Sequence, residues 1–244
     1  MATPKTPVVN AGSKYINGLG ISRTSSTSLT VDAGQCRDST NTNDIISTGS
    51  LVLSSLGTGA NGLDTGTIAA STLYSLHLIG SSDSAEPTAL LLSLSATDPY
   101  LPFNYDEFFR IAFISTDQNS FFREFYKVSG NGNRWMLYDG TLLQVLNAGA
   151  ATSYTDVSLS TTVPAMVTQV LLQATYTPGT AGHTADLRGD DASGTFVQLT
   201  GPVASQAMQA NLIVPCNASA SIQYKNNSSG TLSLSAGGYL DVLI

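Results

Sequence analysis

The strongest restriction on the fold comes from residues 155–244, where short β-strand patterns recur at fairly regular spacing. Gly, Pro and Asn residues stand at the breaks between these patterns. Many short strands separated by turn residues are typical of β-sandwiches and jelly rolls. The sequence therefore predicts a C-terminal β-sandwich of the jelly-roll-like kind. Its strands are expected near 155–159, 165–176, 183–188, 195–199, 208–214, 220–225, 231–235 and 239–244.

Composition extends the β prediction to the whole chain. Charged residues make up 11% of the 244 residues, against roughly 25% in an average soluble domain. Helical surfaces normally carry many Lys, Glu and Arg, so a chain with so few charges must be solvated by hydroxyl and amide groups. Abundant Ser, Thr, Gly and Asn supply these groups, as is common in extracellular and virion β-proteins. We therefore expect an all-β fold.

Three segments are predicted along the chain. Residues 1–14 contain two prolines and no periodicity, so they form an N-terminal arm that is ordered only when bound. Residues 15–146 alternate short strands and turns and form an N-terminal β domain. Residues 142–155 resemble a connector rich in small residues, and the β-sandwich occupies 147–244. The length fits two domains of ordinary size or one large β domain.

The clearest strand pattern of the N-terminal segment covers residues 73–79. Alternate residues share a face of a strand, which places His77 with Leu73 and Ile79 on one face, opposite Tyr74 and Leu76. Residues 89–94 suit a hairpin partner, and residues 108–114 form a further strand. The sequence thus predicts an antiparallel arrangement in the middle of the chain.

Net charge and hydropathy limit the partners. The formal net charge is −7, and phosphate-binding surfaces need clustered Lys and Arg, so nucleic acid is not an expected partner. No apolar run approaches the ~20 residues that span a bilayer, so we expect no membrane insertion. The N-terminal residues lack the apolar core of a secretory signal, so we expect folding in the cytoplasm.

Two distant cysteines, Cys36 and Cys216, are the only ones in the chain. Disulfide-stapled scaffolds usually carry more cysteines at closer spacing. We expect two independent buried or half-buried thiols, although the sequence is also compatible with a disulfide.

Both histidines favour structural roles. His77 lies inside its alternating strand without an acid or nucleophile at a telling spacing, so a structural histidine is favoured over a general base. His183 lies in a Gly-rich turn near several acids, and a calcium ion bound by carboxylates and carbonyls is the alternative there. No recognisable calcium-loop spacing is present, so we favour a solvated turn. The acids are Asp186, Asp190 and Asp191.

Other acidic groups also lack a functional pattern. The polar turn at 38–44 lacks the turn glycine and terminal glutamate of an EF-hand loop; its candidate ligands are Asp38, Asn41, Asn43 and Asp44. Asp106 and Glu107 are adjacent before a strand and should point to opposite faces, whereas a glycosidase needs two carboxylates in one cleft. We predict no catalytic, cofactor-binding or metal-binding residue, although a pair of distant acids stays open.

Three short motifs have weak specificity. Arg188-Gly189-Asp190 spells a tripeptide read by some cell-surface receptors, a match that chance readily produces. Asn217 and Asn227 are formal glycosylation acceptors that matter only in a secretory pathway. The single tryptophan, Trp135, either stacks on a sugar or docks a partner, or else anchors the core or an interface. We favour the anchor, because no second exposed aromatic is clearly placed to help it.

The order of several sequence blocks resembles the tail-fibre and tail-appendage proteins of tailed bacteriophages. The opening module at 14–46 has a Tyr-Ile-x-Gly-Leu strand and an Arg-Asp-Ser-Thr-Asn segment, with Cys36 where the family usually has a small residue. Further similar blocks lie at 62–79, 92–114, 125–139, 160–176 and 221–244. The chain departs from the family at its end, where Gly-Tyr-Leu-Asp replaces a Gly-Trp-Ile-Asp-like strand and charged tail.

The resemblance implies a non-enzymatic structural component of a virion, assembled in the host cytoplasm. Its expected partners are other virion proteins of the tail, collar or capsid, and its expected state is a homotrimer. Residues 15–146 would serve attachment or assembly, and the C-terminal sandwich would point outward. The alternatives are a capsid decoration or head-fibre protein, a receptor module that binds host surface glycan, and an enzyme acting on that polysaccharide. No cofactor is implied.

Overall fold

The computed structural model describes residues 15–130, 133–140, 142–189 and 196–241, so the predicted arm at 1–14 lies outside the described residues. Over the described residues the chain is all-β, with 54% strand and no helix, as predicted. It divides into two compact units. The first holds residues up to Ile68 together with Tyr74–Ala112, and the second holds Ala69–Leu73 together with the residues from Phe113 onward.

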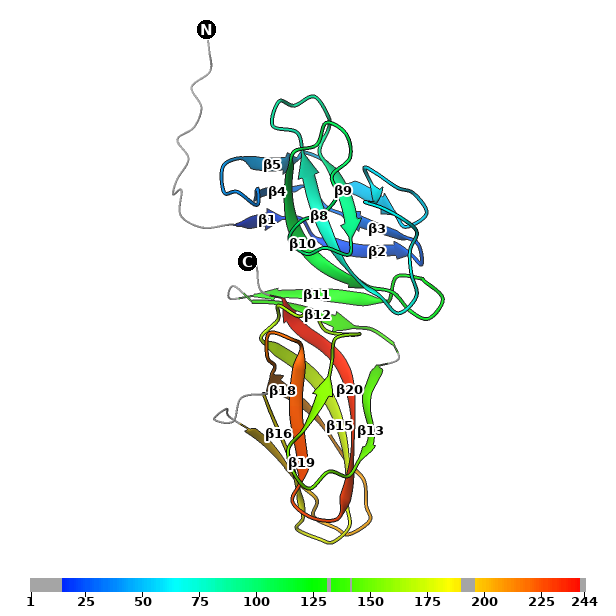
Figure 1. Cartoon of the computed structure of the whole chain (residues 1–244), viewed down its shortest axis with the longest axis vertical. Coiled ribbons are helices and arrows are strands. Elements are labelled where there is room, and N and C mark those ends of the chain that lie inside the picture. Colours follow the sequence, from blue (N-terminus) through cyan, green and yellow to red (C-terminus); the bar gives the residue numbers. More distant parts are fainter. Residues whose placement is uncertain (1–14, 131–132, 141, 190–195, 242–244) are drawn as a thin grey trace. The chain divides into compact units, whose positions relative to one another are not determined.

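Three small sheets build the first unit (Figure 1). Their strand orders are β1-β4-β5, β2-β3-β6 and β10-β8-β9-β7. Strand β7 pairs with β9 in parallel, whereas β9 pairs with β8, and the strands of the two three-stranded sheets pair with one another, in the antiparallel sense. The strands are β1 Ile16–Gly18, β2 Ile21–Ser25, β3 Ser28–Val31, β4 Gly34–Arg37, β5 Asp44–Ser47, β6 Leu51–Ser54, β7 Gly62–Leu63, β8 Leu73–Gly80, β9 Ala89–Ser93 and β10 Glu107–Ser115.

The central strands of this unit are buried on both faces. Every residue of β8 from Tyr74 to Gly80 is buried, and so is the whole of β9. The predicted alternation of 73–79 therefore does not mark a solvent face, because Ser75 and His77 are buried together with the leucines. The predicted hairpin between this strand and 89–94 is present as the antiparallel pair β8 and β9.

The second unit contains two further sheets. One has the order β11-β12-β20-β15-β18, with β13 also paired to β20, and the other has the order β14-β19-β16-β17. The strands are β11 Phe125–Gly130, β12 Asn133–Tyr138, β13 Leu143–Gly149, β14 Thr155–Ser158, β15 Gln169–Pro178, β16 Thr184–Gly189, β17 Phe196–Thr200, β18 Met208–Pro215, β19 Ser221–Asn226 and β20 Gly230–Asp241.

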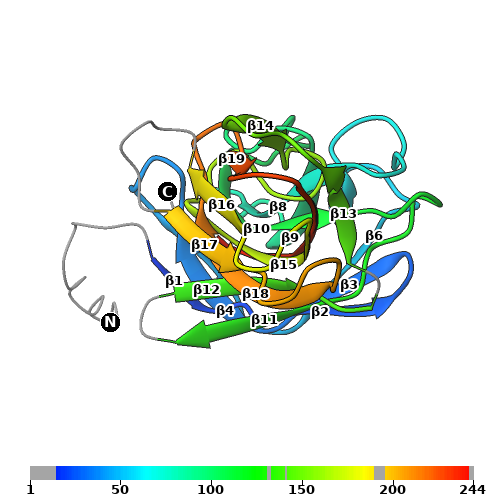
Figure 2. The same cartoon turned by 90° about the horizontal axis from the view of Figure 1, so that it is seen from below.

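Eight of these strands form a jelly roll. The chain passes between two four-stranded sheets, β13-β20-β15-β18 and β14-β19-β16-β17, which is the two-sheet order of that fold. Figure 2 shows β17 and β18, the last strands of the two sheets, side by side. The predicted jelly-roll-like sandwich is thus confirmed, and its first strand begins at Leu143. The hairpin β11 and β12 extends the first sheet beyond β20.

Alternating side chains build the core of this sandwich. On β15 every second residue is buried, and the same holds for the first part of β20. The inward residues include Val170, Leu172, Ala174 and Tyr176 of β15, Leu232 and Leu234 of β20, Leu187 of β16 and Ile222 of β19. The intervening residues face away from the core, which is the outcome that period-two patterning dictates for a sheet packed on one side.

Two sequence predictions differ from this architecture. The supposed connector at 142–155 contains a strand, β13, which pairs with β20 through two register shifts. Its small residues serve close packing, since a Cβ at Gly149 would lie 2.5 Å from the Tyr224 hydroxyl oxygen. The domain boundary expected between 146 and 147 stays a prediction; both residues lie in this strand. The candidates 231–235 and 239–244 belong to one strand, β20, as far as it is described.

Candidate functional site

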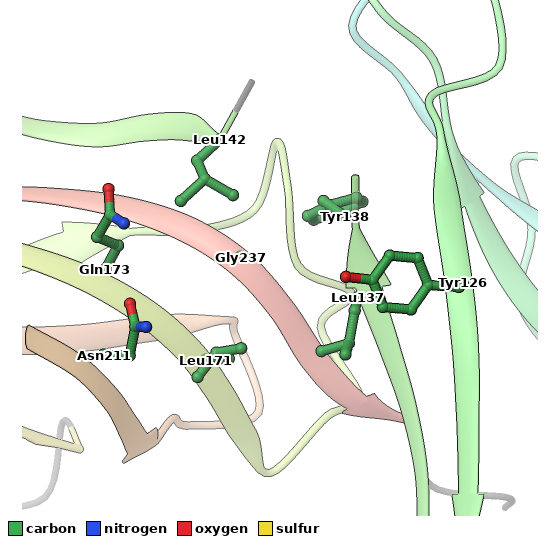
Figure 3. A pocket seen from close by; sticks show the side chains of 8 residues that line it. All are labelled: Tyr126, Leu137, Tyr138, Leu142, Leu171, Gln173, Asn211 and Gly237. Carbon is green, nitrogen blue, oxygen red and sulfur yellow. The ribbon is translucent and has the colours of Figure 1, made fainter. Parts of the chain in front are cut away.

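A pocket of about 190 Å³ opens on the outward face of the β18-β15-β20-β12-β11 sheet, within the second unit. Eight residues line it, from five strands and from the segment that precedes β13 (Figure 3). They are Tyr126, Leu137, Tyr138, Leu142, Leu171, Gln173, Asn211 and Gly237. These residues are spread over more than a hundred positions of sequence, so only the strand order brings them together.

Strand register explains how these residues come together. Tyr126 pairs with Leu137, Leu137 with Gly238, Gly238 with Leu171 and Leu171 with Ile213, so one row crosses all five strands. Gly238 contributes no side chain between the two leucines. The row thus brings Tyr126, Leu137 and Leu171 to the pocket.

The hollow itself lies above Gly237. This glycine is the extra residue of a β-bulge, because Leu171 pairs with Gly238 while Leu172 pairs with Ala236. A Cβ on Gly237 would lie 3.7 Å from Leu171 Cδ2 and 3.8 Å from Leu142 Cδ2, which is ordinary van der Waals contact. The space above Gly237 is thus real and could be filled without a clash. At Gly238, in contrast, a Cβ would lie 2.4 Å from the Met136 carbonyl oxygen.

The rim of the pocket carries an aromatic ring and two amides. Tyr126 is 51% exposed, and its hydroxyl points toward the strand that carries Leu137 (Figure 3). Gln173 and Asn211 stand directly opposite each other on β15 and β18, and Figure 3 shows their amide groups pointing to the same side. Within the described residues, none of these three side chains makes a hydrogen bond to the protein.

No described side chain that lines this pocket is charged. The outward residues that extend the face along β15, β18 and β20 are also neutral, among them Gln169, Thr175, Gln209, Ser233 and Ser235. The site can therefore offer dispersion contacts, an aromatic face and neutral hydrogen-bonding groups, but it has no acid or base with which to transfer a proton.

Trp135 lies on β12, two residues before Leu137, and is half-buried. It therefore shares the outward face with Leu137. Tyr126 on β11 pairs with Leu137 and is a diagonal neighbour of Trp135. The sequence shows no second exposed aromatic clearly placed to help Trp135, whereas the structure places the exposed Tyr126 next to it. The signal was present in the hairpin around 129–133, whose register determines which residues of 125–130 face the tryptophan.

His77 is fully buried in the first unit. Its Nε2 is 3.0 Å from the Ser95 carbonyl oxygen, and its ring contacts Phe108 edge to face. Its Nδ1 has no hydrogen-bond partner among the described residues. Burial lowers the pKa of this imidazole from 6.5 to about 4, because desolvation disfavours the charged ring. The geometry is that of a neutral core histidine.

The polar turn at 38–44 is organised by one buried carboxylate. Asp38 is 3% exposed and accepts hydrogen bonds from the backbone N–H groups of Thr40, Thr42 and Asn43 and from the Thr40 hydroxyl. Although burial acts to raise the pKa of Asp38, the hydrogen bonds lower it overall. Asp44 binds Arg37 at 2.8 Å. These carboxylates are thus occupied by the protein itself.

Asp106 and Glu107 contact different partners, as their adjacency predicts. Asp106 accepts a 2.8 Å hydrogen bond from the Ser82 N–H, and Glu107 accepts one of 2.6 Å from the Asn43 amide. Burial, followed by neighbouring acids, raises the pKa of Glu107 although that hydrogen bond opposes the shift. Both acids link loops of the first unit. They do not face one cleft.

His183 and Asp186 also have structural partners. His183 Nδ1 contacts the Ser228 hydroxyl and lies 3.3 Å from the Ser229 carbonyl oxygen. Asp186 is 4% exposed, accepts hydrogen bonds from Gln198 and Asn227, and pairs with Lys225 at 3.5 Å. Asp190 and Asp191 lie outside the described residues. Over the residues that are described, no group of three or more His, Cys, Asp or Glu side chains could hold a metal ion.

The short motifs are engaged in local structure. The Arg188 guanidinium lies 3.5 Å from the centre of the Tyr154 ring and donates to Gln223 at 2.9 Å, whereas Asp190 of the same tripeptide lies outside the described residues. Asn217 accepts hydrogen bonds from the N–H groups of Ser219 and Ser221 in a turn. Asn227 donates to Asp186 at 3.2 Å.

Both cysteines are free, Cys36 buried and Cys216 partly buried, so the prediction of two independent thiols is confirmed. Burial raises the pKa of Cys36 to about 12 and that of Cys216 to about 11. Neither thiol is therefore poised as a nucleophile at neutral pH. No helix in the described part of the chain is long and apolar enough to cross a membrane.

Comparisons with known proteins do not show a family for this chain. No family model matches it, and no curated protein matches its sequence. Among solved structures, CapF with the inhibitor 3-isopropenyl-tropolone is similar with 7% identity and a TM-score of 0.20, over 56% of this chain and 32% of that chain. A Bacillus thuringiensis Cry1Da tryptic core variant is similar with 10% identity and a TM-score of 0.22, over 88% of this chain and 47% of that chain. The chain thus spans less than half the length of either protein.

Proposed function

We propose that this protein is a non-enzymatic structural component of a tailed-phage virion, as a tail fibre, tail appendage or collar protein. The observation that carries the proposal is the series of blocks between 14 and 139, and again between 160 and 244, that resemble this family in order and spacing. The jelly roll is compatible with that role, since this architecture is used in viral capsid and lectin domains. Fold alone does not select a function.

An exposed aromatic side chain on a hydrogen-bonded turn of the first unit supports a role in assembly. Phe103 is 89% exposed at the tip of a turn closed by the hydrogen bond from Tyr105 N–H to Pro102 O. Leu101 and Tyr105, on either side, pack against the core, and Asn104 donates to Glu86 at 3.2 Å. A large apolar ring presented on a fixed turn is a typical anchor for a protein partner. Other virion proteins are the partners that we propose for it.

The edge of the jelly roll supports assembly with further copies of the chain. Among the described strands, β18 pairs only with β15, so its other edge offers unpaired backbone groups. Residues 208–215 include no charged side chain, and Met208 and Leu212 are only half-buried. Monomeric proteins usually protect such edges with charges or cover them. A homo-oligomer would cover this edge, and the trimer is the state that the resemblance implies.

The acids and histidines weighed as catalysts support a structural role. His77 is enclosed by the core, Glu107 bonds to Asn43, and Asp186 is held by Lys225, Gln198 and Asn227. Each group is therefore used by the fold itself. In this proposal the chain folds in the host cytoplasm and enters the particle there. The N-terminal part attaches it, and the jelly roll points outward.

The test is a cryo-EM reconstruction of the particle whose genome encodes the chain, with the chain located and its copies counted. A small multiple of three copies at the tail or collar is the expected result. Hundreds of copies over the shell would replace the proposal by a capsid decoration protein. Absence from the particle would refute both.

A variant adds a second, independent readout. Phe103→Ala should leave the unfolding temperature unchanged, because the side chain is already exposed, and it should strongly reduce incorporation of the chain into particles. Val203→Ala, which removes a 47% exposed side chain of the second unit, is the matched control and should incorporate normally. Normal incorporation of Phe103→Ala would remove the assigned role of this turn.

A further inference from the structure

The pocket above Gly237 combines three properties that together select a ligand class. Its lining is neutral, its base is apolar, and its rim carries unengaged hydrogen-bonding groups. The apolar part consists of Leu137, Leu142 and Leu171, and the polar part consists of Gln173 and Asn211. A ligand for such a site must present one apolar face and several neutral donors and acceptors.

Neutrality argues against ions. Phosphates and carboxylates are normally bound by Arg, Lys or a row of N–H groups, and metal ions by carboxylates. Neither set lines this pocket. The amides of Gln173 and Asn211 can each donate and accept, which suits hydroxyl groups that do both. The Tyr126 hydroxyl, which points toward Leu137 in Figure 3, adds one more such group.

Size argues for a single ring. Sites for drug-sized molecules measure roughly 300–1,000 Å³, whereas this pocket measures about 190 Å³. The exposed ring of Tyr126 offers a flat surface beside the hollow. A pyranose has an apolar face of C–H groups and a periphery of hydroxyls, so it can stack on the ring and leucines while its hydroxyls reach the amides.

We infer that this pocket binds one neutral pyranose unit of a glycan. Tyr126 supplies the stacking surface, Gln173 and Asn211 bond the hydroxyls, and Gly237 supplies the room. Leu137, Gln173 and Gly237 lie on strands that are paired on both sides, so this part of the site is formed before the ligand arrives. Tyr126 and Asn211 lie on the two edge strands, β11 and β18, and each is held by pairing on one side. Its chemistry is the same whether or not the chain is part of a virion.

The test is NMR titration of the isolated chain with neutral sugars, namely the methyl pyranosides of glucose, galactose and mannose, and N-acetylglucosamine. Glucuronate and glucosamine serve as charged counterparts. We expect binding of at least one neutral sugar in the millimolar range, with shifted amide signals at Leu171, Asn211 and Gly237. Absence of binding by all four neutral sugars well above that range overturns the inference, as does tighter binding of the charged pair.

Two variants locate the binding. Gly237→Ala places a methyl group in the hollow without a clash and should weaken binding about tenfold or more. Asn211→Ala removes a hydrogen-bonding group and should weaken it about fivefold or more. Gln209→Ala, an exposed amide two residues away on the same strand but outside the pocket, is the matched control and should bind like the unchanged chain.

Thermal unfolding curves show whether these variants fold. Binding that survives in both Gly237→Ala and Asn211→Ala, with folding intact, places the sugar elsewhere and overturns the inference. The result is separable from the proposed function. A chain located at the tail that binds no sugar retains its structural role, and a sugar-binding chain that is absent from particles retains this site.

Discussion

Similar side chains have opposite surroundings on the two outward faces of the jelly roll. On the β14-β19-β16-β17 face, amides are tied to charges: Gln223 donates to Asp156 at 2.8 Å and accepts from Arg188 at 2.9 Å. Gln198 donates to Asp186 at 2.9 Å. On the β15-β18 face, Gln173 and Asn211 have no such partners among the described residues. We call these the ionic face and the neutral face.

Aromatic residues show the same contrast. Tyr154 on the ionic face has the Arg188 guanidinium 3.5 Å and the Lys225 amine 4.9 Å from its ring centre. Tyr126 on the neutral face is 51% exposed. Side chains that satisfy one another stabilise the fold but leave nothing to offer a ligand. We therefore expect the neutral face to contribute less to stability, because its amides have hydrogen-bonding capacity that the described chain does not use.

The largest expected effect lies outside both faces, in the first unit. It is the loss of stability on acidification that His77 causes. The folded pKa is about 4 and the ordinary value is 6.5, so between these pH values the unfolded chain binds a proton that the folded chain does not. The first unit therefore has its full stability above pH 6.5 and loses it as pH falls toward 4, by about 3 kcal/mol. Hydrogen exchange of the β8 amides as a function of pH measures this loss.

His77→Gln keeps a donor for the Ser95 carbonyl and removes the titration, so it should flatten the pH profile between 6.5 and 4. Asp186→Asn is the comparison on the ionic face and should leave the β8 profile unchanged. A profile that stays steep in His77→Gln would show that the histidine is not its source.

Removing the central acid of the ionic face should have the next largest effect. Asp186→Ala deletes the acceptor for Gln198, Asn227 and Lys225 and should lower the free energy of unfolding of the second unit by about 2 kcal/mol. Urea unfolding followed by the fluorescence of Trp135, the only tryptophan, reports on this unit. A loss no larger than that of Gln173→Ala would erase the distinction between the faces.

The two tyrosines provide a smaller, matched test. Tyr154→Leu keeps apolar area but removes the ring beneath Arg188 and Lys225, and it should lower the free energy of unfolding by about 1 kcal/mol. Tyr126→Leu should leave that free energy unchanged while it weakens sugar binding. Equal destabilisation by both substitutions in the same urea experiment would mean that Tyr126 is a structural residue and that Trp135 is not assisted by a free aromatic.

Local patterns in the sequence were enough to predict the strands of the jelly roll in the second unit, but they were not enough to predict the pocket above Gly237. Period two along 169–178 already separates inward residues such as Leu172 from outward residues such as Gln173, because a sheet packed on one side buries every second residue. The jelly-roll class followed from the number and spacing of such strands. The predicted connector contained β13, because small residues that suit a flexible link also suit close packing against Tyr224.

The pocket depends on information that no local pattern contains. Its row of residues requires β15 to lie between β18 and β20, and β12 to follow β20, which are pairings between segments far apart in the chain. The bulge at Gly237 sits inside a strand that the sequence divided into two candidates, at the glycine pair itself. The two glycines suggest the end of a strand in the sequence, but in the structure they form a β-bulge inside β20.

The smallest expected effects come from replacing one glutamine on each face. This pair gives the most direct comparison of the two faces, because the same side chain is removed from both. Gln223→Ala on the ionic face leaves Asp156 and Arg188 without a neutral bridge and should lower the free energy of unfolding by about 1 kcal/mol. Gln173→Ala on the neutral face removes a side chain that bonds to nothing in the described chain and should change it by less than about 0.5 kcal/mol. Both substitutions delete the same atoms from a half-exposed position of an inner strand. Their effects on β-strand propensity and on buried area are therefore similar, and the difference between the two free energies reports on the hydrogen bonds. If urea unfolding of the two variants gave equal losses, Gln173 would have a partner within the protein and would not be available to a ligand.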